Sequence, residues 1–384
     1  MTTRRNVLMI LGGGVIAAAG GAGSWATTRD PSRARLPWEA AKTLTPDADP
    51  RRFALSHAIL APNPHNRQPW VADLSVADEV TLFCQADRRL PHTDPFDRQI
   101  TIGLGCFSEL LIMAAAEAGY RVDADFFPAG EPQPRLDDRP VAKFRFVSDP
   151  GVKRDPLFAQ VFDRRSNKEP YDTARPVPAA ELQKISNAVN HVDKGETIDP
   201  ARTKQLRELA WQAMDIEMRT YRTAKESIDL LRIGKSEIEA NPDGIDLPGP
   251  LFEALDAFGM MSRDDMLDTN STVFKQQMDA MRGPFDTAMG FIWLKTQGNS
   301  RAAQIAAGRD YVRINLAATA QGIAMQPFSQ ALQEFDEMAP MFAQLRESLG
   351  IAEIETLQMF ARIGYGSPQK PAPRWPLENR IRSA

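Results

Sequence analysis

The chain has 384 residues, of which 43% are hydrophobic, 25% charged and 8% aromatic. These fractions match folded globular proteins, so they exclude a disordered, collagen-like or small disulfide-scaffold class. Its 46 Lys and Arg against 50 Asp and Glu give a net charge of −4, which provides no bulk positive field to attract nucleic acid. Two cysteines and four scattered histidines predict neither a disulfide framework nor a metal site. We therefore expect a protein that binds a small molecule and no nucleic acid.

The first 26 residues have the pattern of a signal peptide. Arg4 and Arg5 precede an uncharged, Gly- and Ala-rich run from Val7 to Gly23, and Ser24-Trp25-Ala26 offers an A-x-A-like cleavage site. Paired arginines before a weakly hydrophobic run are typical of a twin-arginine (Tat) signal. We expect export by the Tat translocase to the periplasm or beyond, with no stable membrane insertion after cleavage. An uncleaved anchor is the alternative.

The next feature is a pattern that occurs twice. Residues 102–120 and 305–323 both have the apolar spacing of a helix, and at an offset of 203 both contain the string G-x8-A-A-x3-G. The two glycines that open this string are Gly105 and Gly308. Small residues at such spacing let another helix approach closely, so each segment is expected to be the buried central helix of one half of the chain. Chance similarity between two Ala-rich helices is the alternative.

Alternating apolar and polar residues predict half-buried strands at Glu79–Cys84, Val141–Val147 and Met359–Tyr365. Together with the two helices, they predict an α+β fold. Residues 224–300 have no counterpart in the first part of the chain and are rich in Met, Pro and Gly. We interpret them as a helical insertion, which is either a mobile lid or a core region filled by flexible methionines.

Residues 163–171 read D-R-R-S-N-K-E-P-Y. In an extended segment, Arg164, Ser166 and Lys168 would point to one side and present a guanidinium, a hydroxyl and an ammonium group together. This set suits a phosphate monoester, which accepts several charge-assisted hydrogen bonds. A solvated run of charges is the alternative.

Residues 60–70 read L-A-P-N-P-H-N-R-Q-P-W, and we call them the Leu60–Trp70 loop. Its prolines and asparagines predict a rigid, non-helical loop that leads into a strand. The amides of Asn63 and Asn66 could bind a planar heterocycle that needs both donors and acceptors. A structural corner with Asx turns is the alternative. His65 has no carboxylate partner at a useful spacing and is not expected to act as a base.

Together, these motifs resemble the FMN-dependent nitroreductase family. The Leu60–Trp70 loop is similar to the family's P-S-x-x-N-x-Q-P-W loop, with Asn63 in place of the serine, and Arg164–Lys168 is similar to its R-x-S-x-R/K phosphate-binding segment. Gln321–Pro327 is similar to the turn beside the flavin ring, and Arg362–Gly366 with the tail at 373–378 to the closing strand and basic tail. The resemblance implies that FMN contacts these residues: Arg164, Ser166, Lys168, Pro62, Asn63, Asn66, Gln68, Pro327 and Arg374.

The order of the motifs is reversed relative to ordinary members of the family, because here the loop precedes the phosphate segment by about 100 residues. The resemblance therefore implies two fused nitroreductase-like halves that form an intramolecular pseudo-dimer, as in the fused, Acg-like branch. Half one is residues 27–150, and half two is residues 151–384 with the insertion at about 224–300. We expect a monomer with one FMN, since only half one keeps the loop for the flavin ring and only half two keeps the phosphate-binding segment.

The resemblance also implies the chemistry. A flavin carries the hydride itself, so no catalytic side chain is named. We expect an oxidoreductase that passes electrons through FMN to a quinone, a nitro compound or another small acceptor. Export would separate the protein from cytoplasmic NAD(P)H, so the electron donor is left open. One alternative is a non-enzymatic protein that sequesters FMN under a closed lid, and another is a structural relative with an empty site.

Overall fold

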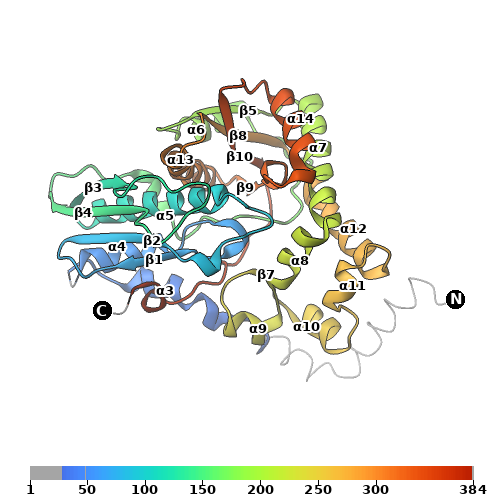
Figure 1. Cartoon of the computed structure of the whole chain (residues 1–384), viewed down its shortest axis with the longest axis horizontal. Coiled ribbons are helices and arrows are strands. Elements are labelled where there is room, and N and C mark those ends of the chain that lie inside the picture. Colours follow the sequence, from blue (N-terminus) through green and yellow to red (C-terminus); the bar gives the residue numbers. More distant parts are fainter. Residues whose placement is uncertain (1–27, 48, 383–384) are drawn as a thin grey trace.

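The computed structural model describes residues 28–47 and 49–382 (Figure 1). The predicted signal peptide, residues 1–26, lies outside the described residues. The described chain forms an α+β fold built on two four-stranded antiparallel sheets, which confirms the predicted class. A further pair of short strands lies in a separate helical region.

The first sheet belongs to half one. After helices α3 (Leu36–Thr43) and α4 (Pro50–Ala58), the chain forms strands β1 (Trp70–Asp73), β2 (Glu79–Cys84), β3 (Tyr120–Phe126) and β4 (Ala142–Ser148). Their order in the sheet is β1-β2-β4-β3. Helix α5 (Arg98–Glu117) lies between β2 and β3 in the chain and connects them. The strands predicted at 79–84 and 141–147 are therefore present.

The second sheet repeats this arrangement in half two. Following α6 (Ala179–Ser186), its strands are β5 (Asp193–Thr197), β8 (Gly290–Gln297), β9 (Ala324–Pro327) and β10 (Glu355–Gly364), with α14 (Ala339–Leu349) before the last. Their order is β5-β8-β10-β9, and helix α13 (Arg301–Ala320) connects β8 to β9. When the four strands of each sheet are numbered in chain order, both sheets have the strand order first, second, fourth, third. The predicted strand at 359–365 is the second part of β10.

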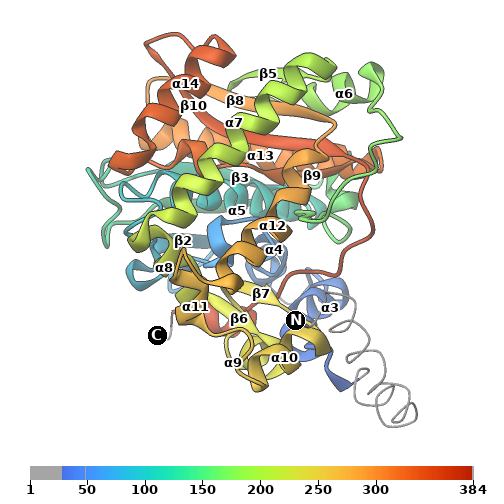
Figure 2. The same ribbon diagram turned by 90° about the vertical axis from the view of Figure 1, so that its right-hand side faces the viewer.

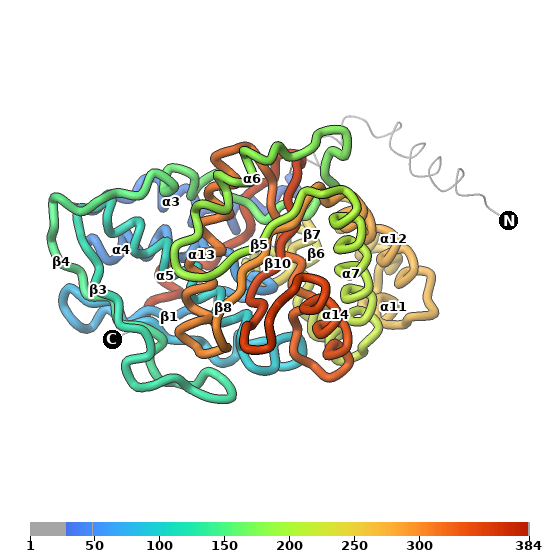
Figure 3. The backbone as a smooth tube through the Cα atoms, turned by 90° about the horizontal axis from the view of Figure 1, so that it is seen from above, coloured from blue at the N-terminus to red at the C-terminus, as the bar shows by residue number. Residues whose placement is uncertain are grey.

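Helices α5 and α13 lie side by side between the sheets (Figures 1 and 3). Both have 20 residues, and their first residues, Arg98 and Arg301, are separated by the predicted offset of 203. Gly105 and Gly308 meet where the helices cross, because a side chain on either glycine would collide with the backbone of the other helix. By length and composition α5 could span a membrane, but 89% of its apolar window is buried inside the fold. It is the core helix of half one.

A helical region connects β5 to β8, whereas β1 and β2 are joined by only residues 74–78. It extends from the second sheet toward the side of the first (Figure 2). Its elements are α7 (Pro200–Arg219), α8 (Tyr221–Asp229), β6 (Leu231–Ile233), α9 (Gly234–Ala240), β7 (Ile245–Leu247), α10 (Pro250–Ala257), α11 (Arg263–Leu267) and α12 (Thr272–Asp286).

The bounds of this insertion differ from the predicted 224–300. It begins about 24 residues earlier because α7 has ordinary amphipathic spacing, and no change of composition marks its start. It ends before 290, since β8 is a strand at the centre of the second sheet. Met261, Met266 and Met278 are buried in a second apolar core together with residues of half two. These methionines therefore fill a core rather than form a free surface.

Candidate functional site

The Leu60–Trp70 loop has a strained backbone. His65, Asn66 and Gln68 have φ values of 46°, 50° and 50°, in the left-handed region that residues other than glycine adopt infrequently. The Asn63 side chain closes the loop on itself, since its Oδ1 accepts a hydrogen bond from the Gln68 backbone N–H at 2.7 Å and its Nδ2 donates to Ala61 O at 3.2 Å. Such strain is kept where the surrounding contacts enforce it, which is typical of functional loops.

Arg374, from the C-terminal tail, holds the loop by its carbonyl groups. Its Nε donates to Ile59 O at 2.8 Å, and its Nη2 donates to Leu60 O at 3.0 Å and Ala61 O at 2.9 Å. Its Nη1 donates to Asn66 Oδ1 at 2.7 Å and to Pro373 O at 2.8 Å. All five N–H donors of this guanidinium are therefore used within the protein.

Arg164 brings half two to the same point of the loop. The side chain is buried, its Nη2 donates to Leu60 O at 3.0 Å, and its Nη1 donates to Asn315 Oδ1 of α13 at 3.0 Å. Its Nε is buried without a hydrogen-bond partner among the described residues. Leu60 O thus accepts hydrogen bonds from two arginines of half two, and one of these still has an unused donor.

The charge of this site is unbalanced. Neither Arg164 nor Arg374 has a carboxylate within ion-pair distance in the described part of the chain. Burial lowers the pKa of Arg164 to about 10. Burial and the charges of Arg164 and Arg165 lower the pKa of Arg374 to about 9, although the charge of Asp246 partly offsets them. The faces of Trp38 stabilise Arg165 and Arg374 through cation–π contacts at 5.0 and 5.6 Å. Buried cations without a counter-ion are costly, so an anion would be stabilised here.

The other residues of the predicted phosphate segment lie at the edge of this cluster. Ser166 is half-buried beside the buried Tyr311 hydroxyl, and Lys168 is exposed. His65 lies near Lys168, and its Nδ1 is buried without a partner among the residues described. Burial, with the charges of Lys168 and Arg67, lowers the pKa of His65 to about 4, so the imidazole is neutral at pH 7.

Two prolines complete the predicted set. Pro62 is buried within the loop, and Pro327 ends β9, where it pairs with Ala361 of β10. The backbone N–H of Asn167 donates to Met325 O at 3.0 Å, which attaches the phosphate segment to β9. Arg164 and Arg374 thus contact the Leu60–Trp70 loop directly and Lys168 lies near its His65, whereas Pro327 pairs with β10.

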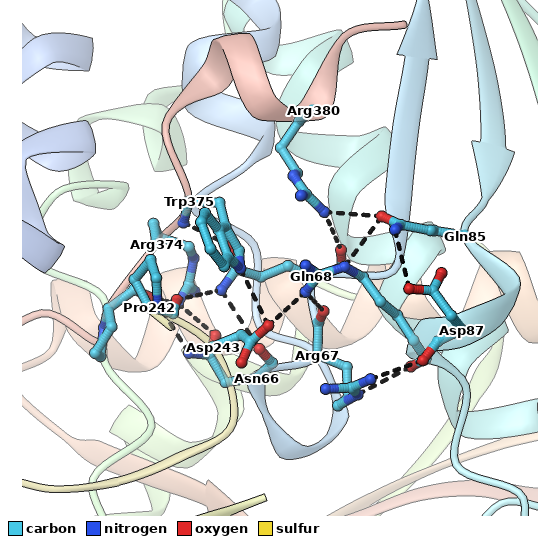
Figure 4. Close-up of polar contacts among 12 residues, drawn as sticks. Asn66, Arg67, Gln68, Gln85, Asp87, Pro242, Asp243, Arg374, Trp375 and Arg380 are labelled. Carbon is cyan, nitrogen blue, oxygen red and sulfur yellow. Dashed lines mark hydrogen bonds and ion pairs between the residues drawn. The ribbon is translucent and has the colours of Figure 1, made fainter. Parts of the chain in front are cut away.

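A turn of the insertion lies against this loop (Figure 4). The buried Gln68 donates through Nε2 to Pro242 O at 2.7 Å and accepts at Oε1 from the Trp375 backbone N–H at 2.9 Å. Asp243 forms an ion pair of 2.6 Å with Arg88 and accepts a hydrogen bond from Trp375 Nε1 at 3.1 Å. The sequence did not single out Pro242 and Asp243 as site residues, because no local signal indicates what this turn contacts.

These contacts change the roles of several predicted residues. The amides of Asn63 and Asn66 were expected to bind a heterocycle, and Gln68 was expected to contact FMN. Both ends of each amide are instead bonded inside the protein, since Asn66 also donates to Pro373 O at 3.1 Å. They fix the shape of the loop. Arg374 was expected to contact FMN, but all its donors hold the loop and the tail instead. Arg164, Ser166 and Lys168 keep donors that fit a phosphate group.

Comparison with known proteins gives a distant relationship along nearly the whole chain. No protein-family model matches. A Mycobacterium tuberculosis protein, found in two strains under the name "Putative NAD(P)H nitroreductase", is 24% identical over 368 residues, which cover 89% of this chain and 94% of that protein.

Solved structures of nitroreductases are also similar to this chain. The FMN-dependent nitroreductase of Mycobacterium smegmatis in complex with NADPH has 19% identity and a TM-score of 0.35, covering 58% of this chain and 94% of its own. The Bacteroides fragilis nitroreductase with bound FMN has 14% identity and a TM-score of 0.31, covering 56% and 89%. The chain is thus, over almost its full length, a distant relative of a protein named as an NAD(P)H nitroreductase.

Proposed function

We propose that the protein is an FMN-dependent oxidoreductase of the nitroreductase family, with FMN bound between the Leu60–Trp70 loop of half one and the Arg164–Lys168 segment of half two. The observation that carries the proposal is the shared acceptor Leu60 O. It joins Arg164 and Arg374 to the loop, at a buried site that holds cations but no carboxylate within ion-pair distance among the described residues. The distant similarity to a named nitroreductase supports the same reading.

The proposal includes the pseudo-dimer. Two sheets with the same strand order, each with a central helix at an offset of 203 residues, fit two fused nitroreductase-like halves. One loop and one phosphate segment meet, so we expect one FMN for each chain and no need for a second subunit. Export of the chain by the Tat translocase belongs to the proposal as well, since it rests on the sequence of residues 1–26 alone.

The residues fit the phosphate of FMN better than its ring. Arg164 would donate from its unused Nε, and Ser166 and Lys168 would add a hydroxyl and an ammonium group from the same segment. Asn63, Asn66, Gln68 and Arg374 would act indirectly, by holding the loop in the shape that meets the ring. Bound FMN would supply electron and hydride transfer through its ring system. The chain would supply position, a cationic environment and exclusion of water.

A second function is favoured by the turn of the insertion. Pro242 and Asp243 cover Gln68 of the loop, and their contacts are buried hydrogen bonds and an ion pair rather than loose surface contacts. A flavin held beneath such a cover would be shielded from a large donor or acceptor. Sequestration of FMN without turnover is therefore the rival to catalysis.

The deciding experiment uses the purified full chain. The ligand released by acid is identified by chromatography and mass, and the bound flavin is then treated anaerobically with NADPH, NADH and dithionite while the absorbance near 450 nm is followed. Bleaching by NADPH or NADH supports the oxidoreductase, and bleaching by dithionite alone supports sequestration. A colourless protein that does not bind added FMN would refute both and favour a structural relative with an empty site.

A further inference from the structure

A groove of about 440 Å³ lies beside the Leu60–Trp70 loop, between residues 89–92 of half one and helix α8 of the insertion. Arg67, the residue between Asn66 and Gln68, lies in its wall together with Arg89, Leu90, Tyr221, Arg222 and Leu230. The volume falls within the range of small-molecule sites. None of the residues predicted to bind FMN lines this groove, so it is separate from the phosphate segment.

Two guanidinium groups in the wall have unused donors. Arg67 donates through Nε to Arg88 O at 3.2 Å and through Nη2 to Asp87 O at 2.9 Å, and its Nη1 has no hydrogen-bond partner within residues 28–47 and 49–382. Arg89 donates through Nε to Ala86 O and through Nη1 to Leu136 O and Asp97 Oδ2, and its Nη2 is likewise without a partner in these ranges. Both arginines are held in place by their other bonds.

The acidic residues of the groove are already satisfied. Glu226 accepts hydrogen bonds from the backbone N–H groups of His92 and Thr93 at 2.9 and 3.0 Å and from the Thr93 hydroxyl at 2.5 Å. Asp229 forms an ion pair of 2.7 Å with Lys225. Neither of these carboxylates pairs with Arg67 or Arg89, and four cations, Arg67, Arg89, Arg222 and Lys225, line the groove against the two carboxylates, which favours an anion.

The rest of the wall is apolar. Leu90 is buried, and Pro91, Tyr221 and Leu230 add an aliphatic and aromatic surface. From this combination we infer that the groove binds a small molecule with an anionic head, either a carboxylate or a phosphate, on an aromatic or other apolar body. Arg67 and Arg89 hold the head. Because Arg67 belongs to the loop, this inference deepens the proposed function and rests on it for the ligand's role as electron acceptor.

The test measures binding directly on FMN-saturated full-length protein, so that the phosphate segment is already filled. Calorimetry compares 4-nitrobenzoate and 4-nitrophenyl phosphate with neutral 4-nitrobenzamide. We expect at least one anion to bind about tenfold or more tightly than the amide, with an affinity that falls as salt rises. The two anions distinguish a carboxylate site from a phosphate site.

Two variants change the groove by different routes. Arg67→Gln removes the free guanidinium arm and should weaken anion binding about tenfold to a hundredfold. Tyr221→Glu adds a carboxylate at an exposed position in the first turn of α8, where the helix dipole favours an acidic residue. It should weaken binding of the anions but not of the amide. Arg145→Gln on β4 and Ile354→Glu are controls with the same charge changes at exposed positions outside the groove.

Equal affinity for anions and amide, or unchanged anion binding in both Arg67→Gln and Tyr221→Glu, would overturn the inference. Flavin content, measured by absorbance in every variant, separates this outcome from failure of the proposed function. Anion binding that depends on Arg67 in a protein that takes up no FMN would establish the site while removing its role in flavin chemistry.

Discussion

Gly105 of α5 lies against the carbonyl oxygen of Ile305 in α13, and Gly308 of α13 lies against the carbonyl oxygen of Ile102 in α5. The two contacts are the same contact with the helices exchanged, because 105 and 308, and likewise 102 and 305, differ by 203. Reciprocal contacts of this kind are typical of a twofold interface between identical subunits. Here both sides belong to one chain.

The first residues of the two helices repeat the relationship. Arg98 of α5 reaches into half two and donates to Leu332 O and Gln358 O. Arg301 of α13 reaches into half one and donates to Pro132 O and Pro134 O. Both side chains are buried, and each stabilises backbone of the opposite half. The halves are therefore joined by matched contacts at the ends as well as at the crossing of their central helices.

Gly308→Ala should destabilise the protein. An added Cβ would collide with the backbone of Ile102, and helix backbone cannot move as a flexible side chain can, so we expect a loss of at least about 1–3 kcal/mol in the free energy of unfolding. Thermal melting measures the effect. Gly151→Ala is the control, because that exposed turn glycine has a φ outside the left-handed region and room for a Cβ, whose nearest neighbour would be 3.5 Å away, and the change should be neutral or stabilising. Equal melting temperatures for both variants would refute the role of the crossing.

The crossing is also where the sequence was most informative. Glycine and alanine at fixed spacing in 102–120 and 305–323 predicted two buried, closely packed helices, since few other residues allow such an approach. Alternation predicted β2, β4 and the second part of β10, whereas β3, β5, β8 and β9 were not predicted. The start of the insertion was missed because α7 has the apolar spacing of any amphipathic helix, and a boundary between two well-formed regions leaves no mark on composition.

The sequence pointed to candidate residues of the site but not to their contacts. The family resemblance assigned Arg164, Asn66 and Arg374 to one site, and the structure places all three at the Leu60–Trp70 loop. Which donors remain free depends on carbonyl groups supplied by the folded loop, and sequence patterns carry no information on these. The same holds for Asp243, whose partner Arg88 is 155 residues away.

Arg164→Gln should weaken FMN binding about tenfold to a hundredfold, because it removes a charge-assisted donor from the phosphate. Riboflavin, which lacks the phosphate, should lose much less. Fluorescence titration of the apoprotein with both flavins measures the two constants. Arg154→Gln, an exposed arginine outside the site, is the control and should change neither. An equal loss for riboflavin and FMN would mean that Arg164 acts through the fold of the loop and not on the phosphate.

Glu217 should make the stability depend on pH. Burial, together with the nearby charge of Glu226, raises its pKa to about 7 despite hydrogen bonds from Gln333 and Ser227. The folded state therefore holds a proton that the unfolded state releases near pH 4.5, so the protein loses stability as pH rises from about 4.5 to 7, by about 3 kcal/mol in total.

Glu217→Gln mimics the protonated carboxyl group at every pH. We expect it to match the wild type near pH 4.5 and to be more stable by about 2–3 kcal/mol at pH 8, as measured by urea unfolding at both values. Glu208→Gln, an exposed change on the same helix, should leave the wild-type pH profile in place. A Glu217→Gln variant with the wild-type slope would show that Glu217 is ionised in the folded protein.

Asp243→Asn tests how the turn of the insertion is held on the loop. Asp243 is buried between Arg88 and Arg232, at 2.6 and 3.0 Å. Although burial by itself raises the pKa of this carboxyl, hydrogen bonds from Trp375 and Arg88 outweigh it, and the pKa lies below its usual value. The carboxylate is charged at neutral pH, so its removal leaves two arginines without their partner. We expect a loss of about 3–5 kcal/mol in the stability of this contact.

The loss should appear first as local opening. Hydrogen exchange followed by mass spectrometry should show faster exchange at residues 241–247 and 66–68 in Asp243→Asn, while α5 and α13 keep the protection of the wild type. Asp264→Asn, an exposed change in α11, is the control. If the turn covers bound flavin, its release should also raise the rate at which NADPH bleaches FMN. Faster exchange with an unchanged or lower rate would mean that the turn stabilises the loop and does not restrict access, which would remove the physical basis for sequestration.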